Sequence, residues 1–171
     1  MKTDPDAWLL AANQHWNIGE TEKALLILDS AITYLPTDSV LTKKRYDFDR
    51  IIKINLHREL YDKANVFFNS KQYPEALEVL NELIQKEPGL TELYLVRAYC
   101  QFYTENYYAC ISDIDIAIEK GTVNYSLVNL RGESYRLLGQ SELACRDFKA
   151  AMDKGNVDAA SNYKKFCVNL E

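Results

Sequence analysis

Apolar residues recur along the chain in four segments that share one template. Each segment has a small residue near its start, a large residue four places later and an apolar residue seven places later. The segments begin at Ala24, Ala76, Cys110 and Ala144. Positions four and seven apart lie on one face of an α-helix, so the template predicts four amphipathic helices with equivalent buried faces.

A second small residue precedes each of these helices by twelve places, and aromatic residues follow it three or four places later. The small residues are Ala12, Ala64, Ala98 and Gly132. They predict a preceding helix whose backbone approaches its partner closely. Turns between the two helices are expected at Gly19, Tyr73–Pro74 and Gly139, because Gly ends helices and Pro suits their first turn. Each unit is therefore predicted to be a helix hairpin.

Three of the four segments follow one another at a strict interval of 34 residues. This interval and the residue types resemble the tetratricopeptide repeat, whose pattern is W-x2-L-G-x2-Y, then A-x3-F, then A and P. The matching residues are Trp8, Ala24, Ala31 and Pro36 in the first unit, Tyr73, Ala76 and Pro88 in the second, and Gly132, Tyr135, Ala144, Phe148 and Ala151 in the fourth. The chain departs from the pattern at Lys63 and Arg97, which replace apolar residues, and at Leu28, which replaces an aromatic one.

The resemblance implies an all-α fold, a right-handed superhelical solenoid of tetratricopeptide hairpins that forms a single domain over residues 1–171. The repeats are expected at about 5–38, 57–90, 91–124 and 125–157. A capping helix is expected at about 158–170, where Ala159, Tyr163, Phe166 and Leu170 share one face. Such a helix would cover the last repeat, as the terminal units of solenoids must.

An insertion interrupts the repeat between Ala24 and Ala76, which lie 52 residues apart, or one repeat plus eighteen. Eighteen residues make five helical turns, so an insertion of this length preserves the buried face. Residues 39–70 contain no Gly or Pro and keep a continuous apolar stripe. One long helix from Ser39 to Ser70 is the favoured prediction, and two shorter helices broken near Asn55 to His57 are the alternative.

The inserted turns bring apolar residues that a single preceding hairpin has to cover. They include Phe48, Ile51, Ile52 and Ile54. If the cover is incomplete, an exposed apolar patch remains, and a symmetric homodimer or an exchange of the first hairpin between two chains would bury it. The alternative is that the first hairpin folds back over the extension.

The composition is that of a globular chain, with 47% hydrophobic and 26% charged residues among 171. The net charge of -5 disfavours nucleic acid and anionic membrane surfaces as partners. No stretch approaches the roughly 18 apolar residues of a membrane span. The first residues carry acids where a secretory signal would carry bases, so a cytoplasmic location is expected.

The four cysteines contain no C-x-x-C pair and have no clustered histidines beside them. They are Cys100, Cys110, Cys145 and Cys167. The favoured interpretation is that they are small buried residues in a reducing compartment. A disulfide or a redox role is the alternative.

No arrangement typical of an active site is present in the sequence. The two histidines, His15 and His57, lie on different units. The sequence contains neither of the glycine motifs that bind nucleotide phosphates, G-x-x-x-x-G-K-[ST] and G-x-G-x-x-G. Asp113 and Asp115 are two residues apart, which directs their side chains to different sides of a helix. Catalytic residues, a metal site and cofactors are therefore not expected, and the chain is not predicted to be an enzyme.

Two Arg–Asp pairs have the same separation of sixteen residues in successive units: Arg97 with Asp113 and Arg131 with Asp147. The corresponding positions in the first two units hold Ala11 with Ile27 and Lys63 with Val79, so Arg and acid occur together or not at all. The joint presence or absence of Arg and Asp in the repeats favours a structural bridge between the two helices of a hairpin. A ligand-binding role is the alternative.

Function is expected on the concave groove that stacked hairpins create, which is lined by the first helix of each unit. Helical spacing predicts that the lining comprises Asn13, Tyr61, Asn65, Phe68, Tyr99, Phe102, Tyr103, Asn129, Glu133 and Arg136. Large, stiff side chains with a polar tip are favoured at protein interfaces. Packing between repeats is the alternative for about half of the aromatic residues.

Tetratricopeptide domains of co-chaperones hold a partner's terminal carboxylates with Lys and Asn one turn apart and with Lys and Arg two repeats later. Here Leu9 precedes Asn13 and Tyr61 precedes Asn65, while Ser126 and Leu130 occupy the later positions. The resemblance therefore does not extend to this carboxylate clamp. Binding of heat-shock chaperone tails is not expected.

The leading hypothesis is a non-enzymatic scaffold or adaptor that binds a peptide or helix of another protein in the groove. The second hypothesis is a small chaperone that holds a client protein, similar to the tetratricopeptide chaperones of secretion systems. The two differ in that the chaperone should keep its client unfolded and co-purify with it.

Overall fold

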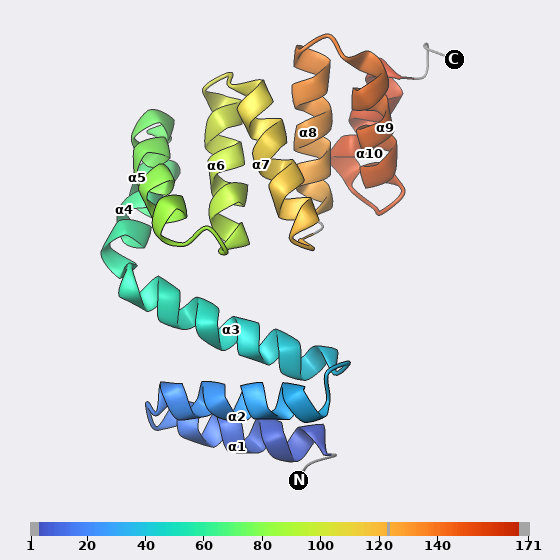
Figure 1. Ribbon diagram of the computed structural model, residues 1–171. Coiled ribbons are helices and arrows are strands. Elements are labelled where there is room, and N and C mark those ends of the chain that lie inside the picture. The colour runs from blue at the N-terminus through green and yellow to red at the C-terminus, as the bar shows by residue number, and fades with distance from the viewer. Residues whose placement is uncertain (1–3, 123, 168–171) are drawn as a thin grey trace. The chain divides into compact units, whose positions relative to one another are not determined.

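The computed structural model describes residues 4–122 and 124–167, which form ten α-helices (Figure 1). In these ranges no strand is present. The chain divides into two compact units, one ending at Arg58 and the other beginning at Glu59, where the sequence favoured a single domain. The all-α class is confirmed.

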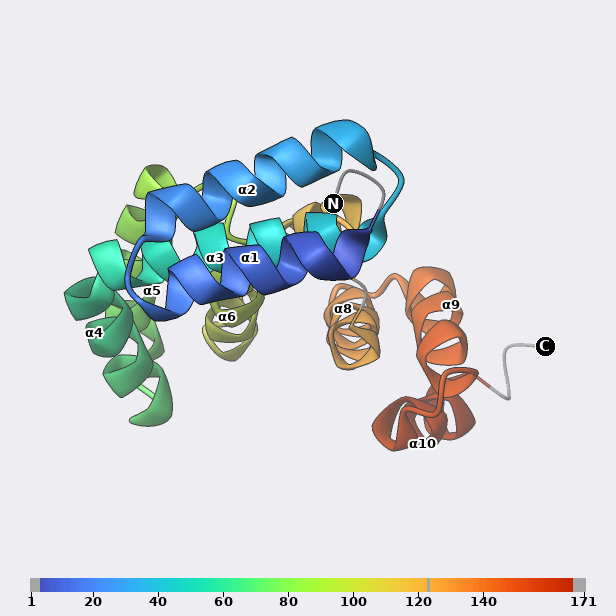
Figure 2. The same cartoon turned by 90° about the horizontal axis from the view of Figure 1, so that it is seen from below.

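Unit 1 contains α1 (Pro5–Asn17), α2 (Thr21–Tyr34) and α3 (Ser39–Leu56). The side chains of Asp4 and Asp38 accept hydrogen bonds from backbone N–H groups in the first turns of α1 and α3, so both helices are capped. α1 and α2 form a hairpin whose helices run side by side, as Figures 1 and 2 show. α3 packs against α2.

The first hairpin covers much of the inserted helix. Phe48 is only 3% exposed, and its ring stacks on that of Trp16 with centroids 3.8 Å apart. Leu41 is fully buried in the same core. Ile51 and Leu56 stay exposed. Folding of the hairpin back over the extension thus buries Leu41 and Phe48, whereas Ile52 and Ile54 are half-buried.

The prediction of one helix from Ser39 to Ser70 is wrong, and the alternative of two helices is confirmed. α3 ends at Leu56, and α4 begins at Arg58 (Arg58–Asn69), with His57 between them in a non-helical conformation. The side chain of Arg58 donates to Asn55 Oδ1 at 2.6 Å. Asn and His are weak helix formers, so the helix can end here without Gly or Pro.

Unit 2 contains α4 and six further helices. They are α5 (Tyr73–Lys86), α6 (Thr91–Tyr103), α7 (Tyr107–Glu119), α8 (Tyr125–Leu137), α9 (Ser141–Met152) and α10 (Val157–Phe166). Three hairpins, α4–α5, α6–α7 and α8–α9, follow one another, and α10 packs against α9 and α8. α10 corresponds to the predicted capping helix, and residues 168–170 of that prediction, Leu170 included, lie outside the described residues.

All four hairpin turns have the same backbone geometry. The residue at the turn has a positive φ of 82° at Gly19, 59° at Lys71, 62° at Glu105 and 77° at Gly139. In each turn the next residue donates its N–H to a carbonyl five residues earlier, which closes the preceding helix. The second turn is therefore centred on Lys71, whereas the sequence placed it at Tyr73–Pro74, which open α5.

Close helix contact at the small residues is confirmed. A Cβ atom added to Gly132 would lie 2.8 Å from two ring carbons of Phe148, which is fully buried. The equivalent residues Ala12, Ala64 and Ala98 are all buried. The first and second helices of a hairpin can approach this closely only where the side chain is small.

Candidate functional site

The two predicted Arg–Asp bridges are present in unit 2. Arg97 donates from Nε and Nη2 to the two carboxylate oxygens of Asp113 at 2.7 and 2.6 Å. Arg131 donates in the same way to Asp147 at 2.7 and 2.9 Å. Both carboxylates are 2% exposed. This bidentate geometry joins the two helices of each hairpin.

Each arginine also reaches back to the preceding hairpin, which the sequence reasoning missed. Nη1 of Arg97 donates to Asn81 Oδ1 at 2.8 Å, and Nη1 of Arg131 donates to Asp115. Both acceptors lie sixteen residues before their arginine, so the same spacing applied in reverse could have found them. Hydrogen bonding to the buried carboxylates raises the pKa of both guanidinium groups. These arginines hold the hairpins together.

An open pocket of about 480 Å³ lies where the turn between α4 and α5 meets the end of α6. We call it the aromatic pocket, and its lining is Phe68, Asn69, Lys71, Tyr73, Tyr99 and Tyr103. Tyr73 and Tyr103 stack with ring centroids 4.7 Å apart, and Phe68 meets Tyr99 edge-on at 6.5 Å. The pocket brings together three of the residues that the sequence predicted for the groove.

Burial raises the pKa of the Tyr99 and Tyr73 phenols, and the neighbouring Tyr103 adds to both shifts. The two groups therefore remain protonated at neutral pH and can donate hydrogen bonds. Lys71 is the charged residue of the lining and is exposed. The aromatic pocket thus combines ring faces, hydroxyl donors and one cation.

A second, more enclosed pocket of about 160 Å³ lies between α4, α5 and α6. We call it the apolar pocket, and it is lined by Tyr61, Ala64, Asn65, Leu80, Leu83, Glu92, Leu93 and Val96. Tyr61 and Asn65 were both predicted to line the groove. Its volume suits one aliphatic side chain, with the amide of Asn65 available to a peptide backbone.

The remaining predicted groove residues have different surroundings. Phe102 meets Tyr103 and Tyr107 edge-on and packs on the core around Ala98, as expected for a residue packed between repeats. Asn13 lies on α1 in unit 1 and is half-buried. Neither residue lines the aromatic or the apolar pocket.

The last three predicted residues contact α10. Asn162 donates from Nδ2 to Asn129 Oδ1 at 3.1 Å and to Glu133 Oε1 at 3.2 Å. The guanidinium of Arg136 lies over the ring of Phe166, 4.6 Å from its centroid. Asn129 is buried. In this structure α10 therefore covers the part of the predicted groove that α8 contributes.

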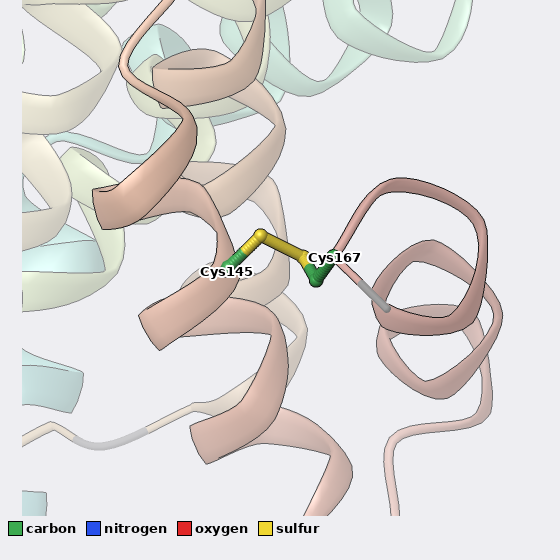
Figure 3. The surroundings of a disulfide bond; sticks show 2 residues. All are labelled: Cys145 and Cys167. Carbon is green, nitrogen blue, oxygen red and sulfur yellow. A yellow bond between two sulfur atoms is a disulfide. The ribbon is translucent and has the colours of Figure 1, made fainter. Parts of the chain in front are cut away.

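The cysteines form two pairs with different chemistry. Cys100 and Cys110 are free and buried, as predicted, and burial raises the pKa of each thiol to about 11. Cys145 and Cys167 form a disulfide between α9 and the end of α10 (Figure 3). The prediction of four free cysteines is wrong for this second pair, because the hairpin of α9 and α10 brings residues 22 apart in sequence together.

His15 lies on α1, and His57 lies between α3 and α4. His15 Nδ1 lies 2.5 Å from Glu20 Oε2, and Glu20 also accepts from Lys23 at 2.6 Å. The hydrogen bond from Lys23 lowers the pKa of Glu20 most, and the hydrogen bond from His15 lowers it further. Among the described residues, no group of three His, Cys, Asp or Glu side chains could hold a metal ion. In the same ranges, every helix is too short or too polar to cross a membrane.

Stacked helix hairpins with small residues at their crossings define a helical-repeat protein whose surface suits protein interaction. The family model of the tetratricopeptide repeat matches residues 60–89, which include most of α4 and all of α5. The chain thus contains a segment that matches the tetratricopeptide repeat, and its hairpins have the tetratricopeptide fold.

Solved tetratricopeptide structures share this fold. The first tetratricopeptide domain of Spaghetti (RPAP3), bound to the HSP90 peptide SRMEEVD, is 22% identical with a TM-score of 0.60, covering 65% of this chain and 90% of that one. The tetratricopeptide domain of Arabidopsis OM64 is 20% identical with a TM-score of 0.62, covering 67% and 97%. A tetratricopeptide repeat protein from Parabacteroides merdae is 23% identical with a TM-score of 0.56, covering 92% and 68%.

Curated relatives cover only part of the chain. The Hsc70-interacting proteins 1 and 2 of Drosophila melanogaster are each 29% identical over 93 residues, which is 54% of this chain. The chain spans about a quarter of the length of these two relatives, 25% in each case.

Proposed function

We propose that unit 2 binds an extended segment of another protein along α4 and α6, with one side chain in each of the two pockets. The observation that carries this proposal is the alignment of the pockets. Tyr61, Asn65 and Phe68 follow one another on one face of α4 at intervals of four and three residues. Their partners across the surface are Glu92 and Val96, then Tyr99 and Tyr103, on α6.

The spacing of the pockets sets the spacing of the bound side chains. Their linings on α6 are displaced by seven residues, which is about 10 Å at 1.5 Å per residue. An extended chain advances about 3.3 Å per residue, so its two anchors would be roughly three residues apart. The small apolar pocket takes an aliphatic anchor. The aromatic pocket takes a flat aromatic or proline side chain, and Lys71 favours an acidic residue beside it.

The same geometry separates this chain from a binder of free carboxyl termini. Leu130 is buried, and Ser126 Oγ accepts a hydrogen bond from Asn156 at 3.4 Å, so neither position offers a cation. The SRMEEVD peptide of the RPAP3 complex therefore serves as a negative control. A chaperone that holds a client stays a second hypothesis, and the Hsc70-interacting relatives are the observation in its favour.

Selection of peptides displayed on phage, against the full chain, tests the proposal. We expect enriched sequences with an aliphatic and an aromatic or proline residue three apart and an acid beside the latter. Selection on a Tyr61→Ser/Tyr103→Ser variant should lose this pattern, whereas a Tyr108→Ser variant, exposed on α7 outside both pockets, should keep it. Enrichment that is the same on all three proteins would refute the proposed site.

Two further expectations remain predictions. A homodimer through α3 would use the exposed Ile51 and Leu56. The cytoplasmic location also stays a prediction. The Cys145–Cys167 disulfide argues against it, because disulfides persist chiefly in oxidising compartments.

A further inference from the structure

α10 is held to the rest of unit 2 by non-covalent contacts, which include the packing of Tyr163 and Phe166 on the core around Ala144 and Phe148. Ala159 is its buried residue, packed in a cluster with Val128 and Ala151. Asn162 supplies the two hydrogen bonds to α8, and Phe166 lies under Arg136. The helix has 10 residues, fewer than an isolated helix needs in water. α10 therefore stays helical only while it is docked on α8 and α9.

A covalent bond supplements this docking at the far end of the helix. The turn before α10 closes at Gly155, whose N–H donates to Met152. At the other end, Cys167 follows α10 directly and is bonded to Cys145 in the first half of α9, with Cα atoms 5.6 Å apart. Figure 3 shows the two sulfur atoms bridging the helices. α10 is thus tied to α9 at both ends.

The arginine that Phe166 of α10 contacts has a polar atom without a hydrogen bond. Arg136 Nε is buried and has no acceptor in the described structure. An unpaired buried donor destabilises the covered state, and separation of α10 from α8 would return it to water. The disulfide opposes this separation because it limits how far α10 can move.

We infer that the Cys145–Cys167 disulfide is a redox-sensitive latch, which keeps α10 over Asn129, Glu133 and Arg136 when oxidised and lets it open when reduced. Opening exposes a polar face of α8 with an acid, an amide and an arginine one turn apart. This inference concerns α8 and α10 and does not rest on peptide binding at α4 and α6.

The reductant is a dithiol, either a small molecule or a dithiol oxidoreductase. Cys145 is the more exposed of the two residues, so the dithiol's thiolate attacks its Sγ. The Cys145–Cys167 bond breaks, a mixed disulfide forms, and Cys167 leaves as a thiolate that takes up a proton. The second thiol of the reductant then displaces Cys145 as a thiol. Two electrons pass to the protein, and the reductant becomes a disulfide.

Hydrogen exchange followed by mass spectrometry tests the latch on the full chain, with and without dithiothreitol. Disulfides that close loops of this size shift local equilibria by roughly two orders of magnitude, so amides of residues 157–166 should exchange at least about tenfold faster after reduction. Peptides from α6 and α7 should not change, which separates opening of α10 from unfolding. A Cys145→Ser variant should match the reduced protein and ignore dithiothreitol.

Labelling of Arg136 by phenylglyoxal reports on the covered surface directly. Its rate should rise severalfold on reduction in the wild-type protein and not in Cys145→Ser, where it should be high throughout. Exchange and labelling that are unchanged by reduction would overturn the latch. A thiol assay on protein that is purified without reductant and then denatured gives a second test. Detection of four free thiols would also overturn the latch.

Discussion

The guanidinium of Arg131 binds the carboxylate of Asp147 through two parallel hydrogen bonds, and through a third it reaches Asp115 on the preceding hairpin. One side chain on α8 thereby connects α7, α8 and α9. Arg97 does the same for α5, α6 and α7 through Asn81 and Asp113. Successive hairpins of unit 2 are therefore joined by polar bridges as well as by apolar packing.

Removal of Arg131 should be strongly destabilising. Arg131→Met leaves the carboxylate of Asp147 almost fully buried without its two hydrogen bonds, which costs about 3–5 kcal/mol in free energy of unfolding. The double variant Arg131→Met/Asp147→Leu should recover part of this loss. Arg45→Met is a matched control, because Arg45 also pairs sixteen residues away, with the exposed Asp29, and should cost less than about 1 kcal/mol. Urea denaturation gives all three values, and an equal loss for Arg131 and Arg45 would contradict the account.

Lys71 and Glu105 occupy the left-handed turn position that Gly19 and Gly139 hold in the other hairpins. A side chain costs roughly 1–2 kcal/mol in this conformation, and the greater freedom of glycine in the unfolded chain offsets part of that. Lys71→Gly and Glu105→Gly should each raise the free energy of unfolding by about 0.5–1 kcal/mol, and Gly139→Ala should lower it by about 1 kcal/mol. Thermal denaturation measures the changes. A lower midpoint for both glycine variants would show that the turns are not strained.

Gly132→Ala tests the close approach of α8 to α9. Alanine favours helices by about 1 kcal/mol over glycine, yet here its Cβ would overlap the buried ring of Phe148. We expect a net destabilisation of about 1–3 kcal/mol. Gly89→Ala is the control, because nothing lies within 4 Å of its added Cβ, and it should change stability little. Stabilisation by Gly132→Ala would mean that the space between α8 and α9 accommodates an added methyl group.

Alkaline pH should destabilise unit 2 through its buried thiols. The ordinary thiol pKa of 9.0 applies in the unfolded chain, and burial raises the folded value to about 11 for Cys100 and Cys110. Between these values the unfolded chain releases protons that the folded one keeps, so stability falls as pH rises from 9 to 11. In Cys100→Ala/Cys110→Ala this part of the slope should disappear. Denaturation midpoints from pH 8 to 11 provide the test, and identical slopes would argue against buried neutral thiols.

Features that recur with the sequence repeat or with helical periodicity could be predicted from the sequence. Periodicity placed the hairpins, the close approach at Gly132 and the pairs that Arg97 and Arg131 form with their own hairpins. The break at His57 could not be located, because an insertion of whole turns preserves the apolar stripe and a local conformational change leaves no periodic signal.

Features that depend on how α10 docks were not predictable. The pairing of Cys145 with Cys167 and the contacts of Asn162 with Asn129 and Glu133 require the crossing of α10 over α8 and α9. α10 belongs to none of the four predicted repeats, so the repeat pattern could not locate this crossing. The sequence placed the candidate groove residues on the first helices of the hairpins, but it could not show which of them α10 covers.

The central proposal is that side chains of one bound segment occupy both pockets of unit 2. Isothermal titration of a peptide selected on the wild-type protein tests it most directly, with Tyr103→Ser, Val96→Asp and the control Tyr108→Ser. The account predicts a loss of affinity of at least tenfold for each of the first two variants, with SRMEEVD showing no binding and Tyr108→Ser unchanged. Wild-type affinity in both Tyr103→Ser and Val96→Asp, with their thermal midpoints intact, would contradict it.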